Sequence, residues 1–445
     1  MDQNSKRENN RLVIVIASEF HSRSFFSGDL FEKLNANFEL QFLVNEEVTT
    51  ENYPSEIRIY KFKVEIAAIK MFPNVLDSSL IRNINRSSSF KFRLRRYLLG
   101  DYRKTIPLSL TGVIRLMTSL FNALPIRYRY QQSRYFKVCQ FSPDLVRNVK
   151  NYDPKFVICW SQSIEPAVVM SMNLAIETKS KSILVFDNWD NLSSKTILLK
   201  KPDYVVCFGN QSKDFAIRIH GLDELKVFGL GSARFDAHSK VDIDNVSSKR
   251  NSIMIAGSSL AMEDSYVLKC ISEILKSTPK DHPIHNYQFV YRPHPQPQGL
   301  SLKLQSWPYK FIKIDSSTPN SSLWQSQNEI QDFLIQQRIV IASPTTLILE
   351  AALNGCKVII PTFKTKGVLT NNRLMLAKLE HLQILNSIKE ISRARNCEEL
   401  RLLLLEGLNS EFKPLSKALV REIVCIEPGD FASRFTDMLL EVTKA

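Results

Sequence analysis

The chain has 445 residues, more than one hydrophobic core usually organises, so we expect two or three domains. Apolar residues make up 44% and charged residues 23%, which is ordinary for a globular protein and excludes a disordered chain. The net charge of +14 is concentrated, because fifteen basic and only two acidic side chains lie between positions 81 and 150. That segment alone therefore carries +13.

The first half of the chain alternates apolar runs with helical patterns. The run at 11–18 is continuously apolar, as is typical of a strand buried in a parallel sheet. Ser142 and Pro143 form a capped start for one of the helices between the strands. Further strands are expected at 39–45, 57–62, 155–161, 182–189, 201–209 and 226–236. This rhythm predicts a doubly wound α/β domain over residues 1–236.

A basic helical pattern interrupts this rhythm over residues 81–140. Its stretch at 106–126 is the most apolar of the chain, but Arg115 near the middle predicts an amphipathic or buried helix and not a membrane span. Basic and aromatic residues beside an apolar face predict docking on an anionic membrane surface. A nucleic acid would not need the apolar face, so none is expected as a partner. A solvated helical insertion is the plain alternative.

A second α/β series follows a polar linker at 237–250. It predicts another doubly wound domain over 251–428, and a C-terminal helix over 429–445. Its strands are expected at 251–256, 287–292, 309–315, 338–342 and 356–363. The predicted fold is therefore two tandem Rossmann-like domains with a basic helical insertion in the first.

The cysteines show no metal-ligand spacing, and several lie inside apolar strand patterns. We expect them to be free thiols that act as small hydrophobes in a reducing compartment, with those in the strand patterns buried. The N-terminus has no signal-peptide pattern, so a cytoplasmic protein is expected. The seven positions are Cys139, Cys159, Cys207, Cys270, Cys356, Cys397 and Cys425.

A turn rich in hydroxyl groups follows a buried strand of the second series. Ser343, Thr345 and Thr346 stand at the start of the next helix, where free N–H groups and the helix dipole favour phosphate. Glu350 lies one turn further and could accept both hydroxyls of a ribose. A helix whose hydroxyls satisfy only its own backbone is the equal alternative.

Two further loops follow strands of the same predicted sheet. Gly257 and Ser258 make a short turn that lets a backbone or a phosphate approach closely. Arg292 can bind phosphate oxygens in a forked geometry, and His294 can donate to a phosphate or protonate a leaving group. Because these loops meet at one edge of the sheet, we predict a nucleotide-binding site there.

Polar residues also follow strands of the first series. Glu19 and His21 come after the first strand, and Asp187 and Asp190 come after another. A carboxylate or imidazole there could deprotonate an acceptor hydroxyl. Simple capping of the next helix is the alternative, and the sequence does not choose among the four.

Four motifs together resemble GT-B glycosyltransferases, and among them bacterial capsule-biosynthesis transferases and the glycerol-phosphate polymerases of teichoic acid. The resemblance spans about 156–363 and leaves out the basic segment. The motifs are FDNWDNLSSK at 186–195, GLGSARFD at 229–236, YRPHP at 291–295 and SPTTLILEAALNGCKVIIP at 343–361.

The resemblance implies that the donor nucleotide binds to the C-terminal domain. It places Glu350 near the ribose, Ser343, Thr345 and Thr346 near the phosphates, and Arg292 and His294 beside the leaving phosphate. Enzymes of this fold generally work without a metal, so neither metal nor cofactor is expected.

One position departs from the resemblance. Many retaining members carry a second glutamate where this chain has Ala342, so we expect an inverting mechanism with one base from the first domain.

The expected enzyme moves a sugar from a nucleotide-sugar donor to a surface polysaccharide or lipid-linked acceptor, at the inner face of the plasma membrane. A polyol-phosphate transferase, a nucleotide-sugar 2-epimerase and a non-catalytic scaffold are the alternatives.

Overall fold

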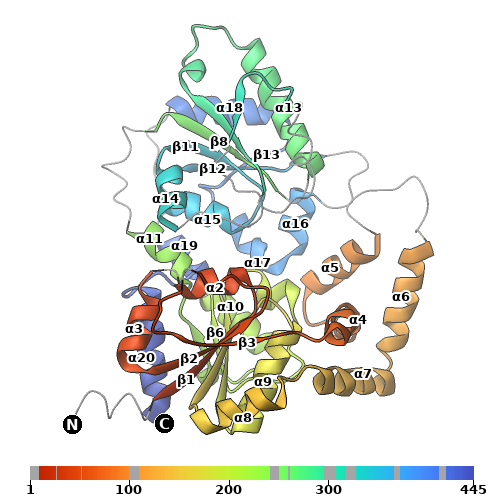
Figure 1. Ribbon diagram of the computed structural model, residues 1–445. Coiled ribbons are helices and arrows are strands. Elements are labelled where there is room, and N and C mark those ends of the chain that lie inside the picture. The colour runs from red at the N-terminus through yellow and green to blue at the C-terminus, as the bar shows by residue number, and fades with distance from the viewer. Residues whose placement is uncertain are drawn as a thin grey trace. The chain divides into compact units, whose positions relative to one another are not determined.

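The computed structural model describes residues 10–26, 28–51, 53–99, 110–240, 250–258, 261–294, 307–315, 327–364, 371–409 and 417–444. These residues form two compact units (Figure 1). The first unit contains the described residues up to Leu98, 110–236 and 421–444, and the second contains 237–409 and 417–420. Most of the predicted linker, at 241–249, lies outside the described residues.

The first unit is built on a seven-stranded sheet whose neighbouring strands all pair in parallel. The order is β3-β2-β1-β4-β5-β6-β7, so the direction of winding reverses between β1 and β4. The strands are β1 (Arg11–Ile16), β2 (Glu39–Asn45), β3 (Arg58–Phe62), β4 (Phe156–Trp160), β5 (Lys181–Phe186), β6 (Tyr204–Cys207) and β7 (Val227–Gly229).

Helices cover both faces of this sheet. Side chains alternate along a strand, so Val13 and Val15 enter the core on one face while Leu12 and Ile14 enter the core on the other. The helices are α2 (Glu19–Phe26), α3 (Leu30–Asn37), α4 (Ile66–Arg82), α5 (Ser88–Leu99), α6 (Leu110–Asn122), α7 (Pro125–Val138), α8 (Pro143–Tyr152), α9 (Pro166–Thr178), the π-helix η1 (Asn191–Lys195), α10 (Asn210–Arg218), the short η2 (Glu224–Lys226) and η3 (Ala233–Phe235), and α20 (Phe431–Lys444).

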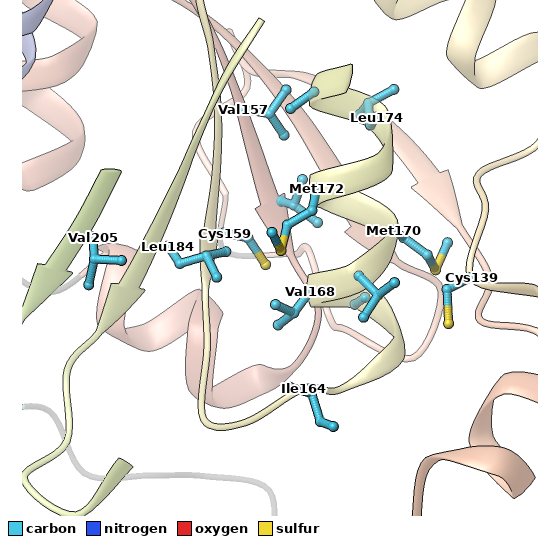
Figure 2. Close-up of a cluster of buried hydrophobic side chains, with 14 of the residues drawn as sticks. Cys139, Val157, Cys159, Ile164, Val168, Met170, Met172, Leu174, Leu184 and Val205 are labelled. Carbon is cyan, nitrogen blue, oxygen red and sulfur yellow. The ribbon is translucent and has the colours of Figure 1, made fainter. Parts of the chain in front are cut away.

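Cys139, Cys159 and Cys207 take part in the core of the first unit, and Figure 2 shows the first two. Cys159 lies on β4 beside Val168 and Leu184, and Cys139 lies near Met170. Burial raises the pKa of the Cys159 thiol to about 12, so the thiol stays protonated and behaves as a small hydrophobe. The expectation for the buried free cysteines is confirmed.

The expectation of seven free thiols is wrong for one pair. Cys270 and Cys397 form a disulfide, with their Cα atoms 5.6 Å apart and a sequence separation of 127. They lie on α13 and at the start of α18, two helices that pack against each other. Spacing along the chain could not show this proximity, because it arises from helix packing.

The basic insertion is helical, as predicted, but its helices begin at Ile66, earlier than the expected position 81. Helices α6 and α7 pack against α4, and both α4 and α7 contact α9 (Figure 1). Arg82 ends α4 and donates to the carbonyl oxygen of Ala123, which joins α4 to the turn between α6 and α7. Among the described residues, no helix is both long enough and apolar enough to cross a membrane.

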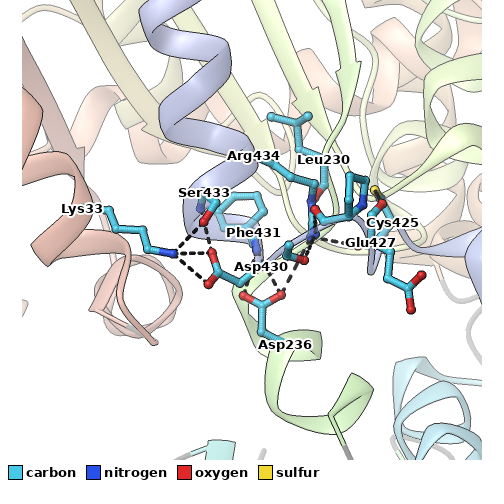
Figure 3. Close-up of polar contacts among 11 residues, drawn as sticks. Lys33, Leu230, Asp236, Cys425, Glu427, Asp430, Phe431, Ser433 and Arg434 are labelled. Atoms are coloured by element: carbon cyan, nitrogen blue, oxygen red, sulfur yellow. Dashed lines mark hydrogen bonds and ion pairs between the residues drawn. The ribbon is translucent and has the colours of Figure 1, made fainter.

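The C-terminal helix α20 belongs to the first unit, where it contributes Phe431 and Phe435 to the core. Figure 3 shows the polar contacts that fasten its start. The carboxylate of Asp236 accepts the backbone N–H of Phe431 at 3.0 Å, and Lys33 Nζ lies 2.8 Å from the carboxylate of Asp430. The first unit therefore resumes at Arg421, whereas the sequence placed the end of the second domain at 428.

The second unit contains a six-stranded parallel sheet of order β10-β9-β8-β11-β12-β13, whose winding reverses between β8 and β11. Its strands are β8 (Ser252–Ala256), β9 (Gln288–Arg292), β10 (Ile312–Ile314), β11 (Gln337–Ile341), β12 (Lys357–Pro361) and β13 (Ser392–Ala394). Its helices are α13 (Ala261–Ser277), η5 (Pro283–Asn286), α14 (Gln327–Ile335), α15 (Thr346–Leu353), α16 (Asn372–Lys378), α17 (Glu380–Gln383), η7 (Ile384–Asn386) and α18 (Cys397–Asn409). Two helices join the units in sequence, α11 (Asp236–Ser239) and α19 (Lys417–Ile423).

Candidate functional site

The predicted donor residues of the second unit lie at the point where its sheet reverses direction. Gly257 and Ser258 follow β8, and Ser343 to Thr346 follow the neighbouring strand β11. Open α/β sheets bind ligands outside the carboxyl ends of their strands at such a switch point. The topology therefore supports the predicted location of a ligand site.

Gly257 is needed for the packing of two loops. Its backbone N–H donates to the carbonyl oxygen of Arg292 at 2.7 Å. A Cβ atom at this position would lie 2.8 Å from the backbone nitrogen of His294 and 2.8 Å from the hydroxyl oxygen of Tyr291. The close approach that the sequence predicted is thus made by the loop after β9, which is held against the loop after β8.

Ser258 has a structural partner that the sequence did not reveal. Its backbone N–H and its hydroxyl each donate to the carboxylate of Asp264 on α13, both at 2.8 Å. Tyr291 adds a weaker contact to the same carboxylate at 3.5 Å. Burial raises the pKa of Asp264 to about 6, although these donors act in the opposite direction. The observed role of Ser258 is to fix the loop to α13.

Arg292 and Glu350 interact although 58 positions separate them. The Arg292 guanidinium lies 3.4 Å from the carboxylate of Asp315 and 5.0 Å from the ring centre of Phe333. Burial lowers the pKa of Arg292, while the negative charges of Asp315 and Glu350 act to raise it. Glu350 is only 1% exposed. The structure thus forms a buried cation–carboxylate cluster beside the switch point, and half-buried His294 follows directly after Pro293.

The start of α15 offers one accessible hydroxyl. Thr345 is exposed and precedes the helix in an extended backbone conformation, and its side chain makes no capping hydrogen bond. Thr346 is half-buried, whereas Ser343 is only 7% exposed. The alternative of a self-capped helix therefore does not describe Thr345. Its hydroxyl and the N-terminal N–H groups of α15 remain suited to an anion.

A cavity of about 1250 Å³ lies at the ends of β12 and β13 and was not anticipated from the sequence. Arg393 contributes a buried Nε atom without a hydrogen-bond partner in the described part of the chain. Glu399, the acidic lining residue, is paired with Arg395 at 2.7 Å. This basic cavity suits an anionic ligand. Its basic lining residues are Lys364, Arg373, Arg393 and Arg395.

In the first unit, Asp187 follows β5 and is the predicted catalytic carboxylate with a raised pKa. It is 4% exposed, and burial raises its pKa to about 6. A hydrogen bond from Ser24 of α2 and the positive charges of Arg234 and Lys195 act in the opposite direction. Its Oδ1 atom has no hydrogen-bond partner among the described residues. This carboxylate can take up a proton near neutral pH, as a general base must.

The other three catalytic candidates of the first unit have different surroundings. His21 is buried on α2, and burial lowers its pKa to about 4, so its imidazole is neutral at pH 7. Glu19 accepts the backbone N–H of Thr49 at 2.7 Å. Asp190 lies 2.8 Å from Lys195 Nζ and precedes the π-helix η1. Glu19 and Asp190 therefore have structural partners, but these are not helix caps: Thr49 lies in a loop, and the Asp190 side chain makes no capping hydrogen bond to η1.

The sequence missed the residues that surround the predicted ones. Ser24 and Arg234 act to lower the pKa of Asp187 against the effect of burial. Asp315 and Phe333 contact the guanidinium of Arg292. Arg234 lies inside the motif at 229–236, so that motif was a usable signal. In the described ranges, no group of three or more His, Cys, Asp or Glu side chains is arranged to hold a metal ion.

No protein-family model matches the chain, and no curated protein matches its sequence. Solved structures do match its architecture. The UDP-GlcNAc 2-epimerase from Methanocaldococcus jannaschii aligns with a TM-score of 0.52 and 11% identity, over 97% of this chain and 99% of that one. The chain has the GT-B fold. The predicted fold class is therefore confirmed, including the helical insertion and the C-terminal helix.

Two further GT-B structures align over most of their length. MurG from Acinetobacter baumannii has a TM-score of 0.46 and 11% identity, over 97% of this chain and 99% of that one. The wall teichoic acid polymerase TagF has a TM-score of 0.45 and 10% identity, over 100% and 90%. At 11% identity the likeness to the epimerase shows the fold alone, so the reaction is argued from the residues.

Proposed function

We propose that this GT-B protein is a glycosyltransferase that moves a sugar from a nucleotide-linked donor to a surface-polysaccharide or lipid-linked acceptor. The observation that carries the proposal is the Arg292–Glu350 cluster beside the β8/β11 switch point. A guanidinium held in place by Asp315 and Phe333 beside the switch point suits phosphate oxygens, and the neighbouring carboxylate of Glu350 suits ribose hydroxyls. The epimerase that shares the fold is named for a nucleotide-linked sugar, UDP-GlcNAc.

The second unit binds the donor in this proposal. The hydroxyls of Thr345 and Thr346 and the free N–H groups of α15 hold the phosphates, and Glu350 accepts the ribose hydroxyls. Arg292 and His294 stabilise the negative charge that develops on the leaving phosphate. These donors and the helix dipole supply the stabilisation for which other transferases use a metal ion.

The first unit supplies the base. Asp187 removes the proton from the acceptor hydroxyl, whose oxygen then forms a bond to the anomeric carbon of the sugar. The bond from that carbon to the phosphate oxygen breaks, and the electron pair leaves with the nucleoside phosphate. Ala342 occupies the position where many retaining members carry a glutamate, so inversion at the anomeric carbon is the expected outcome.

A nucleotide-sugar 2-epimerase is the second candidate, because the structure with the TM-score of 0.52 is such an enzyme. An epimerase returns a sugar that is still linked to its nucleotide and needs no acceptor. A transferase releases the nucleoside phosphate only when an acceptor is present. Analysis of the products from a labelled nucleotide sugar, with and without lipid-linked glycan, separates the two.

Nucleotide binding tests the proposal directly. Thermal unfolding is measured with UDP, GDP and CMP, and one of them should stabilise the chain by about 2–3 kcal/mol at a hundredfold excess over its Kd. Arg292→Ala should weaken that nucleotide by about 10- to 100-fold, since it removes a charge-assisted contact. Glu350→Gln keeps the side-chain volume and should weaken it less.

Arg401→Ala is the matched control, because Arg401 lies on α18 in the same unit and pairs only on the surface with Glu398. It should leave nucleotide binding unchanged. A chain that none of the three nucleotides stabilises would leave the non-catalytic scaffold as the better explanation.

A further inference from the structure

Helix α6 exposes several large apolar side chains and buries two polar ones. Met117 is 62% exposed and Ile114 is 56% exposed, whereas Ser119 is 1% exposed and Asn122 is 8% exposed. Surface helices of globular proteins show the opposite arrangement, with the apolar face towards the core. The Ser119 hydroxyl is buried without a hydrogen-bond partner among the described residues. The orientation of α6 is therefore unfavourable unless something covers its apolar side.

The exposed apolar side extends beyond α6 into the turn and the next helix. In Figure 1, α6 stands at the right-hand margin of the first unit. Residues spaced by three and four positions share one side of a helix, so the members on α6 form a stripe. We call this set the α6 face, and its members are Val113, Ile114, Met117, Leu120, Phe121, Leu124 and Ile126.

Basic side chains follow the α6 face directly. Arg127 and Arg129 are exposed at the start of α7, and the Arg127 guanidinium lies 4.3 Å from the ring centre of Phe121. Arg134 and Lys137 are exposed further along α7. Between positions 81 and 150 the sequence has only two acidic residues. Apolar residues flanked by arginine and lysine suit the boundary between acyl chains and anionic headgroups.

Two other partners of the α6 face fit the observations less well. A second copy of the chain would bring two segments of charge +13 together, and like charges at an interface are unfavourable. A nucleic acid would satisfy the arginines but would leave the exposed apolar side chains in water. An anionic bilayer satisfies both parts of the surface.

We propose that the α6 face inserts into the headgroup region of an anionic lipid bilayer, with the basic residues of α7 on the lipid phosphates. This inference is independent of the donor site, because no residue of the α6 face belongs to it. It gives the protein a surface attachment without a membrane-crossing helix and would bring the enzyme to a lipid-linked acceptor.

Vesicle flotation of the full chain tests the proposal. Vesicles of phosphatidylcholine with phosphatidylglycerol should carry the protein upward, and vesicles of phosphatidylcholine alone should carry much less. Higher salt should weaken the binding because it screens the basic residues. The triple variant Ile114→Ser, Met117→Ser, Leu120→Ser should reduce the bound fraction at least about tenfold, since it removes the inserted side chains.

A matched triple variant controls for the loss of exposed apolar area. Ile176, Leu225 and Leu402 are 52%, 83% and 53% exposed and lie outside the α6 face. Their replacement by serine should leave flotation unchanged, and neither triple variant should lower the unfolding midpoint. The proposal is overturned if anionic vesicles do not carry the wild-type protein or if both triple variants float equally. It is also overturned if light scattering shows a dimer that the Ile114, Met117 and Leu120 variant dissociates.

Discussion

The two sheets of this protein wind alike and reverse direction at equivalent places, yet different chemical groups stand at the strand ends near the two switch points. The first unit has His21 after β1 and Asp187 after β5, next to β4, and burial moves their pKa values to about 4 and about 6. The second has the guanidinium of Arg292 beside buried carboxylates and an exposed hydroxyl at Thr345. In the proposed function, one topology thus carries the base in one unit and the groups that bind the phosphates in the other.

The comparison shows that the function follows from the groups at the strand ends and not from the fold. A perturbed pKa arises where desolvation is strong and compensation is weak, as at Asp187. Where carboxylates surround a charge, as Asp315 and Glu350 surround Arg292, the group is held in a fixed position.

The largest expected effect comes from Asp187→Asn. If Asp187 is the base, the variant should lose about 10²- to 10⁴-fold in kcat. In the wild type, kcat should rise as the pH increases through about 6, because the base must be ionised. Steady-state rates between pH 5 and pH 8 measure both effects.

The same substitution should stabilise the fold at neutral pH. The folded pKa of Asp187, about 6, lies above the unfolded value of 3.8, so ionisation is penalised in the folded state. The wild-type chain therefore loses stability as the pH rises from about 4 to about 6, and Asn avoids this loss. Urea unfolding at pH 7.5 should show a gain of up to about 3 kcal/mol, and at pH 4 almost none.

Asp190→Asn is the control from the same loop. Its ion pair with Lys195 is partly exposed, so its removal should cost at most about 1 kcal/mol and leave the rate unchanged. Loss of activity in Asp190→Asn combined with full activity in Asp187→Asn would reverse the assignment of the base.

A smaller effect is expected from Ser258→Ala, which distinguishes a structural residue of the second switch point from a binding one. The variant removes a hydrogen bond to buried Asp264 and should cost about 1–2 kcal/mol in the free energy of unfolding. Nucleotide affinity should stay the same in titration calorimetry. A large loss of affinity without a loss of stability would place Ser258 in contact with the donor.

The smallest effect, about fivefold in nucleotide affinity, is expected from Thr345→Val, since one neutral hydrogen bond contributes about 1 kcal/mol. Its hydroxyl makes no capping bond, so the free energy of unfolding should change by less than about 0.5 kcal/mol. Unchanged affinity with a stability loss near 1 kcal/mol would mean that the hydroxyl caps α15 after all.

The sequence by itself determined the fold and most of the candidate residues. Continuous apolar runs such as that of β1 mark strands buried on both faces, and the helices between them require parallel pairing. The ends of these strands then identified the loops after β8, β9 and β11. The net charge and the apolar stripe of the insertion could also be seen in the sequence.

Only the tertiary structure decided which candidates have unusual properties. Asp187 differs from Asp190 because tertiary packing buries it to 4% exposure, whereas Asp190 stays partly exposed beside Lys195. Asp264 and Asp315 were not anticipated because their partners come from other strands and helices. Helical periodicity shows that α6 has an apolar side, but only its packing against α4 decided that this side faces outward. The burial of a side chain and its hydrogen-bond or ion-pair partners depend on contacts between distant segments. A local sequence pattern does not contain these contacts.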